Sequence, residues 1–357
     1  MPRLSIRKFL NNKITAYLLA GIFLLLAILL GIAIGTVSVP IPIIIKIITG
    51  NLFGTLRAEH IDPMYSSIVM NIRLPRVILS GLVGASLAIA GAAFQGLLRN
   101  PLADPYTLGV SSGASVGAVI TLFFNLTIPF VGAFTLPLFS IVFSFITIFC
   151  VLMFARKIER SMRVETIILT GIIFSSFLGA MISLMIALTG DELRQIIGWL
   201  LGSVSMRGWV YIKIILPFFI IGSIILIFNA KELNAMSFGE ERAHHLGVNV
   251  QKRKLIVLSA GSILTGAAVA VSGTIGFVGL VIPHLTRLIW GPDHKHLLPL
   301  SIFIGSGFLI LADLVSRTII SPTELPIGVI TSLIGAPVFA VILLQRKRIE
   351  RSGKNDA

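Results

Sequence analysis

Few side chains in this sequence have both the type and the spacing that catalysis or metal binding requires. His294 and His296 lie in the segment DHKH, but no third ligand is near them in the sequence, so we expect a solvated turn. Glu165 and Asp313 lie near the ends of apolar segments, whereas ion-coupled carriers keep ionisable groups at mid-depth. The phosphate-binding pattern GxxxxGK followed by Ser or Thr does not occur. We therefore expect no catalysis, no metal site and no cofactor on this chain.

Three arginines could instead recognise carboxylates. Arg73, Arg76 and Arg317 lie on the side of the membrane where the chain holds few cations. Pro75 suits the first turn of a helix, so we expect Arg73 and Arg76 to flank a helix start at the surface. Asp313 precedes Arg317 by one turn. Two interpretations stay open: side chains that reach the membrane surface, with an ion pair from Asp313 to Arg317, or a cationic dock for carboxylates of an external partner.

The longest polar run, 231–254, predicts a short helix with both ends marked. Ser237 and Glu240 have the spacing of a capping box, and Gly247 falls where a helix ends in a left-handed residue. A helix of about nine residues is marginal alone in water, so it should pack against another surface. That surface is either an ATPase that drives a membrane channel or the chain's own helix bundle.

Composition identifies a polytopic membrane protein. The chain has 357 residues, of which 55% are hydrophobic and 12% are charged, about half the charge of an ordinary soluble domain. The net charge of +14 comes from short basic clusters between apolar segments, which is typical of membrane orientation rather than of nucleic-acid binding. Cys150 should be a small buried apolar residue. The basic segment 1–13 resembles a signal peptide, but the apolar run 14–39 is too long for one, so we expect a retained first span.

Ten segments are apolar and long enough to be candidate membrane spans. They cover residues 14–38, 73–95, 107–126, 134–155, 165–188, 209–230, 254–272, 275–290, 298–317 and 327–345. Together they predict an all-α fold and a single transmembrane domain over 1–357, with no space for a separate soluble domain. Most of the 29 basic residues lie inside if both termini are cytoplasmic, which fits an even number of spans.

Two shorter segments should lie beside the bundle rather than cross it. PIPIIIKIITG, ending at Gly50, predicts a helix in the membrane interface. The segment 191–205 predicts a short outer helix. The small-residue segments 82–96 and 258–273 look alike and fall five spans apart, which indicates an inverted repeat, although similar helix packing alone could produce the likeness.

Two motifs place prolines or repeated glycines within or beside apolar segments. The segment 95–115, QGLLRNPLADPYTLGVSSGAS, predicts a structured turn followed by closely packed helices. In 272–287, the glycines Gly273, Gly276 and Gly279 recur every three residues, which no robust helix tolerates. Broken helices at membrane depth must line protein or a wet cavity, so this segment is either a gate or a close-packed kink.

The motifs RLPR at 73–76, the segments 95–115 and 272–287, and ADLVSRTIISPTELPIGVITSLIGAPVF at 312–339 resemble the FecCD/BtuC-like permease family of iron–siderophore, haem and cobalamin ABC importers. The resemblance implies a subunit of ten helices in a bacterial or archaeal cell membrane. It also implies a second permease, identical or a sister chain, two separate ATPase subunits that hold ATP and Mg²⁺, and an external substrate-binding protein. No enzyme activity is expected on this chain, and no nucleic-acid partner.

The resemblance assigns roles to residues of this chain. It implies that Arg73, Arg76 and Arg317 receive glutamates of the binding protein. The expected coupling segment contacts the ATPase and comprises Ser237, Phe238, Gly239, Glu240, Glu241, Arg242, Ala243, His244, His245, Leu246 and Gly247. The expected translocation path comprises Thr170, Gly171, Ser175, Ser176 and Gly179 of the fifth span, together with Gly273, Gly276 and Gly279.

The expected cargo is an iron(III)–siderophore chelate, with cobalamin or haem as alternatives for the same machinery. An ion-coupled secondary transporter is the alternative from a different class. A secondary carrier would work in vesicles that lack the ATPase, under an ion gradient alone.

Overall fold

Long apolar helices make up the regular structure, as a bilayer requires because it offers no water to unpaired backbone groups. The computed structural model describes residues 13–53 and 62–355, and the regular elements in these ranges are all helical. Within them, 7 helices are long and apolar enough to cross a membrane. They are α2 (Lys13–Ala33), the continuous helix Pro63–Leu97, α7 (Thr135–Ile158), α8 (Val164–Leu188), α10 (Gly208–Phe228), α13 (Val250–Ser272) and α15 (His294–Thr318).

The other three predicted spans fall on shorter apolar helices. These are α6 (Val110–Phe123), α14 (Val278–Trp290) and the first part of α16 (Ile327–Asn355). The first two are short because irregular backbone precedes them: a 3₁₀ turn, η3 (Pro105–Leu108), before α6, and the segment 273–277 before α14. Each of the ten predicted spans therefore coincides with a helix, and the all-α fold class is confirmed.

The second span does not begin where the sequence predicted. The helix starts at Pro63, where the Asp62 carboxylate accepts a hydrogen bond from the Met64 N–H at 2.8 Å. It continues through α4 (Pro63–Ser67) and a π-helical turn, η2 (Ile68–Arg73), into α5 (Leu74–Leu97). A proline inside an α-helix clashes with the carbonyl four residues earlier. The wider π turn just before Pro75 relieves that clash, so the expected helix start at Arg73 is wrong.

Helices outside the main bundle lie close to their predicted positions. The predicted interface helix is α3 (Ile41–Phe53), which continues three residues past Gly50, and the predicted outer helix is α9 (Leu193–Leu200). Cys150 is only half-buried in α7, because its face of that helix is not fully covered.

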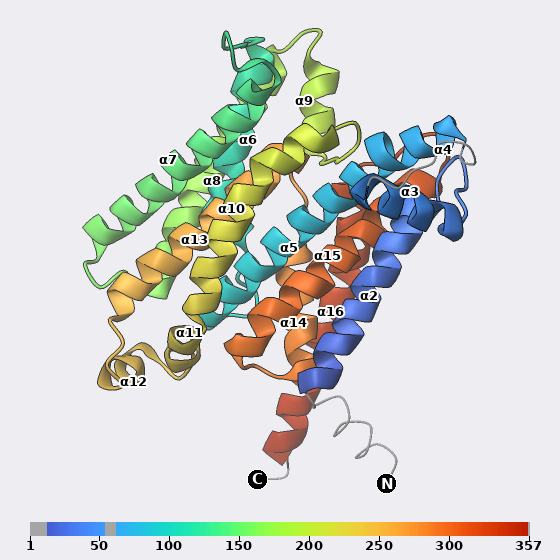
Figure 1. Cartoon of the computed structure of the whole chain (residues 1–357). Helices are drawn as coiled ribbons and strands as arrows, with labels where there is room; N and C mark the ends of the chain where they lie inside the picture. The colour runs from blue at the N-terminus through green and yellow to red at the C-terminus, as the bar shows by residue number, and fades with distance from the viewer. Residues whose placement is uncertain (1–12, 54–61, 356–357) are drawn as a thin grey trace.

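The helix α5 lies at the centre of the bundle, between α13, α15 and α14 (Figure 1). The look-alike segments pack against each other in opposite directions. Phe94 near the end of α5 shares one core cluster with Leu258 and Leu264 and lies against Gly261, whereas Leu87 lies with Ala267 and Val271 in another cluster. The opposite orientation of the two segments is confirmed, and the inverted repeat itself remains a prediction.

The two ends of the bundle differ in what they carry. One end, called the inner end below, carries α11 (Ala230–Ser237), α12 (Glu240–His245), the start of α2 and the last turns of α16 (Figure 1). The opposite, outer end carries α3 and α9. This arrangement fits termini on one side of the membrane, although segments 1–12 and 356–357 lie outside the described residues. That the inner end faces the cytoplasm remains a prediction.

Candidate functional site

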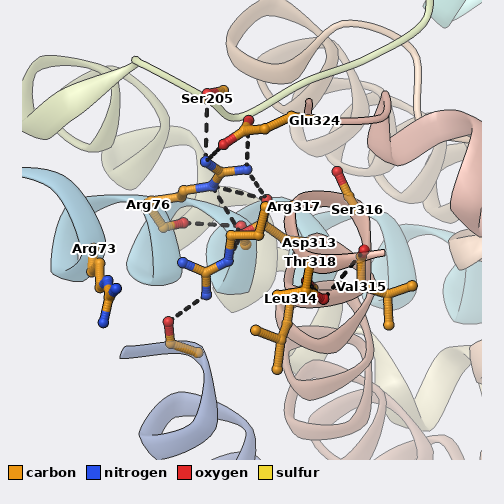
Figure 2. A network of polar contacts seen from close by, with 12 residues as sticks. Arg73, Arg76, Ser205, Asp313, Leu314, Val315, Ser316, Arg317, Thr318 and Glu324 are labelled. Carbon is orange, nitrogen blue, oxygen red and sulfur yellow. Dashed lines mark hydrogen bonds and ion pairs between the residues drawn. The ribbon is translucent and has the colours of Figure 1, made fainter. Parts of the chain in front are cut away.

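At the outer end, one arginine is held by two carboxylates. The guanidinium group of Arg76 donates to the Asp313 carboxylate at 2.9–3.0 Å and to the Glu324 carboxylate at 2.7 and 3.1 Å, as Figure 2 shows. Asp313 is 1% exposed and Arg76 is 8% exposed. Charge-assisted, two-pronged contacts of this kind are the strongest hydrogen bonds available to side chains. The pair fixes α5 against α15 and against the loop that follows α15.

The other two arginines bind the carbonyl groups at the end of a neighbouring helix, α2. Arg73 donates to the carbonyl oxygens of Ile32 at 2.7 Å and Ala33 at 3.0 Å, and also to Val37. Arg317 donates to the Gly31 carbonyl oxygen. The last carbonyls of a helix lack backbone partners and attract cations, so both arginines cap the C-terminal end of α2.

The predicted exposure of these arginines is therefore wrong. Arg73 is 4% exposed, and Arg76 and Arg317 are each 8% exposed. Their guanidinium groups face carbonyls and carboxylates of their own chain rather than solvent. The expected ion pair between Asp313 and Arg317 exists only as a long contact of 3.9 Å. No contact of the described residues tests the docking role of the three arginines.

Sequence reasoning missed Glu324, the exposed member of this network. Its side chain is 38% exposed, and it lies in the loop between α15 and α16. Partial burial alone would raise the pKa of Glu324, but the hydrogen bonds and the charge of Arg76 outweigh it and lower the pKa below its ordinary value of 4.5. The available signal was one acidic residue within the motif SPTELP, close to Arg317 in the sequence.

At the inner end, the capping box is absent. Ser237 is the last residue of α11, and its hydroxyl donates to the Asn234 carbonyl oxygen at 2.7 Å. Gly239 precedes α12, which has no side-chain cap. The Glu240 carboxylate instead pairs with Lys254 at 2.7 Å. The helix therefore has six residues, Glu240–His245, rather than about nine.

The C-terminal end of α12 has the predicted form. Gly247 has a φ of +83°, and its N–H donates to the His244 carbonyl oxygen at 2.9 Å. The Val248 N–H donates to the Ala243 carbonyl oxygen at 3.0 Å. This pair of bonds is a Schellman motif, so the left-handed Gly247 is confirmed.

The helix α12 rests lightly on the bundle and presents apolar side chains outward. Ala243 is fully buried, whereas Phe238 is 66% exposed and Leu246 is 70% exposed. A cavity of about 1060 Å³ between α12 and the turns near Arg99 and Ser161 lies on one side. Both alternatives for this helix thus have support: it touches its own bundle, and it leaves large apolar groups for another surface.

The expected solvated turn at His294 is wrong. His294 is 3% exposed, its backbone N–H donates to Asn234 Oδ1 at 2.8 Å, and its Nδ1 lies 2.8 Å from the same oxygen. Asn234 also donates to Asp293 at 2.7 Å, which joins α11 to the start of α15. His296 lies 3.2 Å from the Tyr17 hydroxyl. No group of three possible metal ligands occurs among the described residues.

A cavity of about 640 Å³ opens on one flank of the bundle. Hydroxyl groups and small aliphatic side chains form its wall, and the lining residues that the structure describes carry no charge. They are Tyr106, Ser111, Ser112, Ser115, Ile182, Leu200, Leu201, Thr274, Gly276, Gly328, Val329, Ser332 and Leu333. Such a wall can hold a large ligand through many weak contacts without binding it tightly.

The glycine-rich break supplies part of this wall. The chain leaves the helix at Gly273, with φ of +70°, and resumes after Phe277, with φ of +67°. The Tyr106 hydroxyl donates to the Ile275 carbonyl oxygen and accepts from its N–H, both at 2.8 Å. Gly276 lines the cavity, whereas Gly273 and Gly279 pack tightly against backbone, and the path role of all three remains a prediction.

The path residues predicted in the fifth span, α8, are not among the residues that line this cavity, and their path role remains a prediction. The Thr170 hydroxyl is buried and donates to the Thr166 carbonyl oxygen at 2.7 Å. A Cβ atom on Gly171 would lie 2.6 Å from the Thr107 carbonyl oxygen, so Gly171 serves a close backbone approach. Neither residue lines the cavity. Of the other expected path residues of α8, Ser175 is half-buried, Ser176 is exposed and Gly179 has open space beside it.

The serines of α6 were missed as cavity residues. Ser111 and Ser115 lie one turn apart and so share a face of the helix. Sequence reasoning assigned them to helix packing, since small residues serve that purpose as well. Their spacing was the available signal.

A buried carboxylate, that of Asp104, lies near this region, beside Gly279. Asp104 caps η3 by accepting from the Tyr106 N–H at 3.1 Å. Burial raises the pKa of Asp104 to about 6, although the bond from the Tyr106 backbone acts in the opposite direction.

Comparison with known proteins gives a consistent result. Residues 23–345 match the FecCD transport family. The chain is 62% identical, over 342 residues, to the uncharacterized ABC transporter permease protein YvrB of Bacillus subtilis, and the match covers 96% of this chain and 97% of that protein. It is 43% identical, over 280 residues, to the cobalamin import system permease protein BtuC of Halobacterium salinarum, covering 78% of this chain and 74% of that protein.

A solved structure shares the fold. It is described as an inward-facing conformation of a metal-chelate type ABC transporter, with a TM-score of 0.78 and 32% sequence identity. The similarity covers 91% of this chain and 97% of that chain.

Proposed function

This chain belongs to the FecCD transport family, and we propose that it is the membrane-embedded permease subunit of an ATP-driven importer for a metal chelate. An external binding protein would deliver the chelate to the outer end. Two ATPase subunits, which hold ATP and Mg²⁺, would act on the inner end of this permease and of a second one. The chain itself would carry no catalytic group.

The observation that carries the proposal is the exposed apolar surface of α12. Phe238 and Leu246 flank a helix that touches its own bundle through Ala243 and through the ion pair of Glu240 with Lys254. Burying such side chains stabilises a complex by about 1.5–3 kcal/mol each. A partner that covers α12 would therefore gain affinity and hold a movable helix at the same time.

The flank cavity supports a bulky cargo whose charges are compensated internally. Its lining, within the described residues, offers hydroxyl groups and aliphatic side chains but no ion. An iron(III)–siderophore chelate fits this chemistry. Cobalamin fits it too, and the relative from Halobacterium salinarum, named as a cobalamin import permease, favours cobalamin as the second candidate.

The outer arginines keep a docking role in this proposal, but in a changed form. Arg73, Arg76 and Arg317 outnumber Asp313 and Glu324, so the cluster retains positive charge. Because Glu324 is its exposed carboxylate, an acidic side chain of the binding protein could compete with Glu324 for Arg76. Docking would then act on the loop that leads into α16, whose Val329 and Ser332 line the cavity.

Reconstitution tests the transport function directly. The permease, its ATPase and its binding protein are placed in proteoliposomes, and uptake of an iron(III) trihydroxamate, haem and cyanocobalamin is measured. We expect ATP-dependent accumulation of one of these chelates. Accumulation by the permease alone under a proton or sodium gradient would contradict the proposal and favour an ion-coupled carrier.

A segment exchange tests the coupling role of α12. Replacing Glu240–His245 with a Gly/Ser stretch should leave ATP hydrolysis measurable but abolish ATP-dependent uptake. Normal coupled uptake by this variant would exclude the segment from coupling.

Cysteine labelling tests the pathway. Single cysteines at Ser112 and Ser115 should react with a polar maleimide at rates that depend on nucleotide. Cysteines at Thr170 and Ser175, which are not among the residues that line the cavity, should react more slowly. Sites in α6 that stay inert in every nucleotide state would exclude this cavity from the path.

A further inference from the structure

One lysine at the inner end is buried completely, which is rare for this side chain unless its charge is paired. Lys254 lies in the second turn of α13, and its side chain has 0% exposure. Its ammonium group donates to the Glu240 carboxylate at 2.7 Å and to the Met162 carbonyl oxygen at 2.9 Å. Three segments far apart in the sequence therefore meet at one nitrogen atom: α12, α13 and the turn between α7 and α8.

That turn is itself fixed to the start of α8. The Glu159 carboxylate accepts from the Ser161 hydroxyl at 2.6 Å and from the Thr166 hydroxyl at 3.0 Å, and it pairs with Arg163 at 2.9 Å. Thr166 lies in the first turn of α8, and Met162 lies between these contacts. A displacement of the Met162 carbonyl group must therefore also displace the start of α8.

The helix α8 in turn abuts the segment that precedes the cavity wall. A Cβ on Gly171 would lie 2.6 Å from the Thr107 carbonyl oxygen and 2.8 Å from the Leu108 Cα, so these backbones are in close contact. Immediately after Leu108 the chain enters α6, whose Ser111 and Ser112 line the cavity. A shift of α8 along its axis would therefore press on the segment that leads into the wall of the cavity.

The lysine contact resists separation for an electrostatic reason. An ammonium group without a partner inside a protein costs several kcal/mol, and the Lys254 side chain is completely buried. The neighbouring Arg253 is held differently: it donates to the Asn229 side chain at 2.8 Å and pairs with Glu232 at 3.1 Å, which ties α13 to α11. Of these two cations, only Lys254 joins α12 to the α7–α8 turn.

We propose that Lys254 is the positioning residue that carries a displacement of α12 to α8 and from there to the cavity. The ammonium group holds the Glu240 carboxylate and the Met162 carbonyl together, so the three segments move as one unit when the ATPase moves α12. The inference rests on the proposed function, because it requires an ATPase at the inner end.

The test measures how nucleotide changes the cavity, so it needs no identified cargo. The assembled complex of permease, ATPase and binding protein carries S112C as a reporter in a C150A background. A polar maleimide labels it without nucleotide and after trapping with ATP and vanadate. K254M keeps the length of the side chain and removes its charge. We expect the nucleotide-dependent change in labelling rate to fall at least about fivefold, the low end of coupling between distant sites.

Matched variants separate this role from a structural one. K252M removes an exposed lysine two residues away and should keep the full change. K254R keeps the charge and should restore part of the change. K254M should still bind the ATPase and hydrolyse ATP, because Phe238 and Leu246 are untouched. If K254M fails to assemble, E240Q removes the partner charge instead and should show the same loss.

Two outcomes count against the proposal in different ways. A K254M or E240Q complex that keeps the full nucleotide-dependent change overturns the role of Lys254 and leaves the proposed function intact. A wild-type complex whose labelling never depends on nucleotide overturns the proposed function, and this inference with it.

Discussion

The two ends of the bundle hold their charges in opposite ways. At the outer end, Arg76 is buried and satisfied by Asp313 and Glu324. At the inner end, α12 carries most of its charges in the open, and only Glu240 reaches a buried partner. The outer network, whose charged groups are satisfied by one another, fixes the relative positions of its helices. The single buried pair beneath the exposed α12 can instead transmit a displacement of that helix to the segments below it. The comparison therefore predicts that outer variants change stability and that inner variants change coupling.

The largest effect should follow loss of Asp313. D313A leaves the Arg76 guanidinium buried with only the half-exposed Glu324 as counter-charge. Removing one partner of a buried pair costs about 3–5 kcal/mol, so the thermal unfolding midpoint of the purified protein should fall sharply. Among molecules that remain folded, the amount of cargo moved per ATP should stay close to wild type.

A double variant gives the control for this prediction. R76M/D313L removes both charges and replaces them with apolar groups, which in other proteins is often close to neutral. Its unfolding midpoint should lie well above that of D313A. An equal loss in both variants would show that the ion pair is not the cause. A loss of coupling without a loss of stability would reverse the comparison between the two ends.

Two carboxylates should make the stability of the protein depend on pH in opposite directions. Glu324 has a lowered pKa because Arg76 outweighs its partial burial, so its contribution to stability is present above pH 4.5 and is lost as pH falls through its folded pKa. Asp104 behaves in the opposite sense. Its pKa of about 6 lies above the ordinary 3.8 because burial disfavours the charged carboxylate. The buried charge of Asp104 therefore lowers the stability of the fold at pH 7. This destabilisation disappears as the pH falls from 6 toward 3.8 and the carboxylate takes up a proton.

D104N should therefore stabilise the protein at neutral pH. Asparagine can still accept from the Tyr106 N–H as a cap, and it carries no charge to bury. A pKa shift of this size corresponds to a gain on the order of 1–3 kcal/mol at pH 7, read as a higher unfolding midpoint. The gain should shrink at pH 5 and vanish near pH 4. D191N, at an exposed outer position, is the control and should have no effect. A gain of equal size at pH 7 and pH 5 would contradict the assigned titration.

A smaller effect is expected from the apolar flank of α12. F238S removes an exposed ring that the ATPase would cover, so the affinity of the permease for its ATPase should fall about tenfold, or about 1.4 kcal/mol. F228S, at an exposed position near the end of α10, is the matched control. Equal affinity of F238S and F228S for the ATPase, measured by pull-down at several concentrations, would remove Phe238 from the interface.

The helices could be predicted from sequence because they depend on local composition. Apolar length placed each of the ten spans on a helix, and Gly247 marked the end of α12 through its own backbone preference. The predicted helix start near Pro75 was wrong because a π turn accommodates that proline within a continuous helix, and no sequence pattern indicated the π turn. Local signals thus sufficed for helix existence, but not for helix boundaries.

The side-chain contacts could not be predicted because their partners are distant in the chain. Arg73 meets carbonyls about forty residues earlier, and Arg76 meets Asp313 across 237 residues. Lys254 looked like one more cation of the polar loop, since the Met162 carbonyl, 92 residues away, is invisible to spacing. The sequence therefore identified these charged residues but could not show which partners they contact or how deeply they are buried.

The smallest expected effect on stability comes from Glu324. E324Q keeps an oxygen that can accept from Arg76, and the site is partly open to solvent, so we expect a change of about 0–1 kcal/mol. Capture of the binding protein should nevertheless become several-fold tighter, because the Arg76 charge is less neutralised and a partner carboxylate no longer has to displace one. This gain should fade at high salt, where exposed charges are screened.

E192Q distinguishes competition at Arg76 from a general gain in positive charge. Glu192 accepts from Asn125 at 3.1 Å near α9, so its loss changes the net charge equally without touching Arg76. Capture should therefore tighten in E324Q and not in E192Q. The wild-type protein should behave like E324Q only below pH 4.5, since the Glu324 pKa is lowered. Equal tightening in both variants would mean that the binding protein senses only overall charge, and the outer network would then be a structural lock with no part in docking.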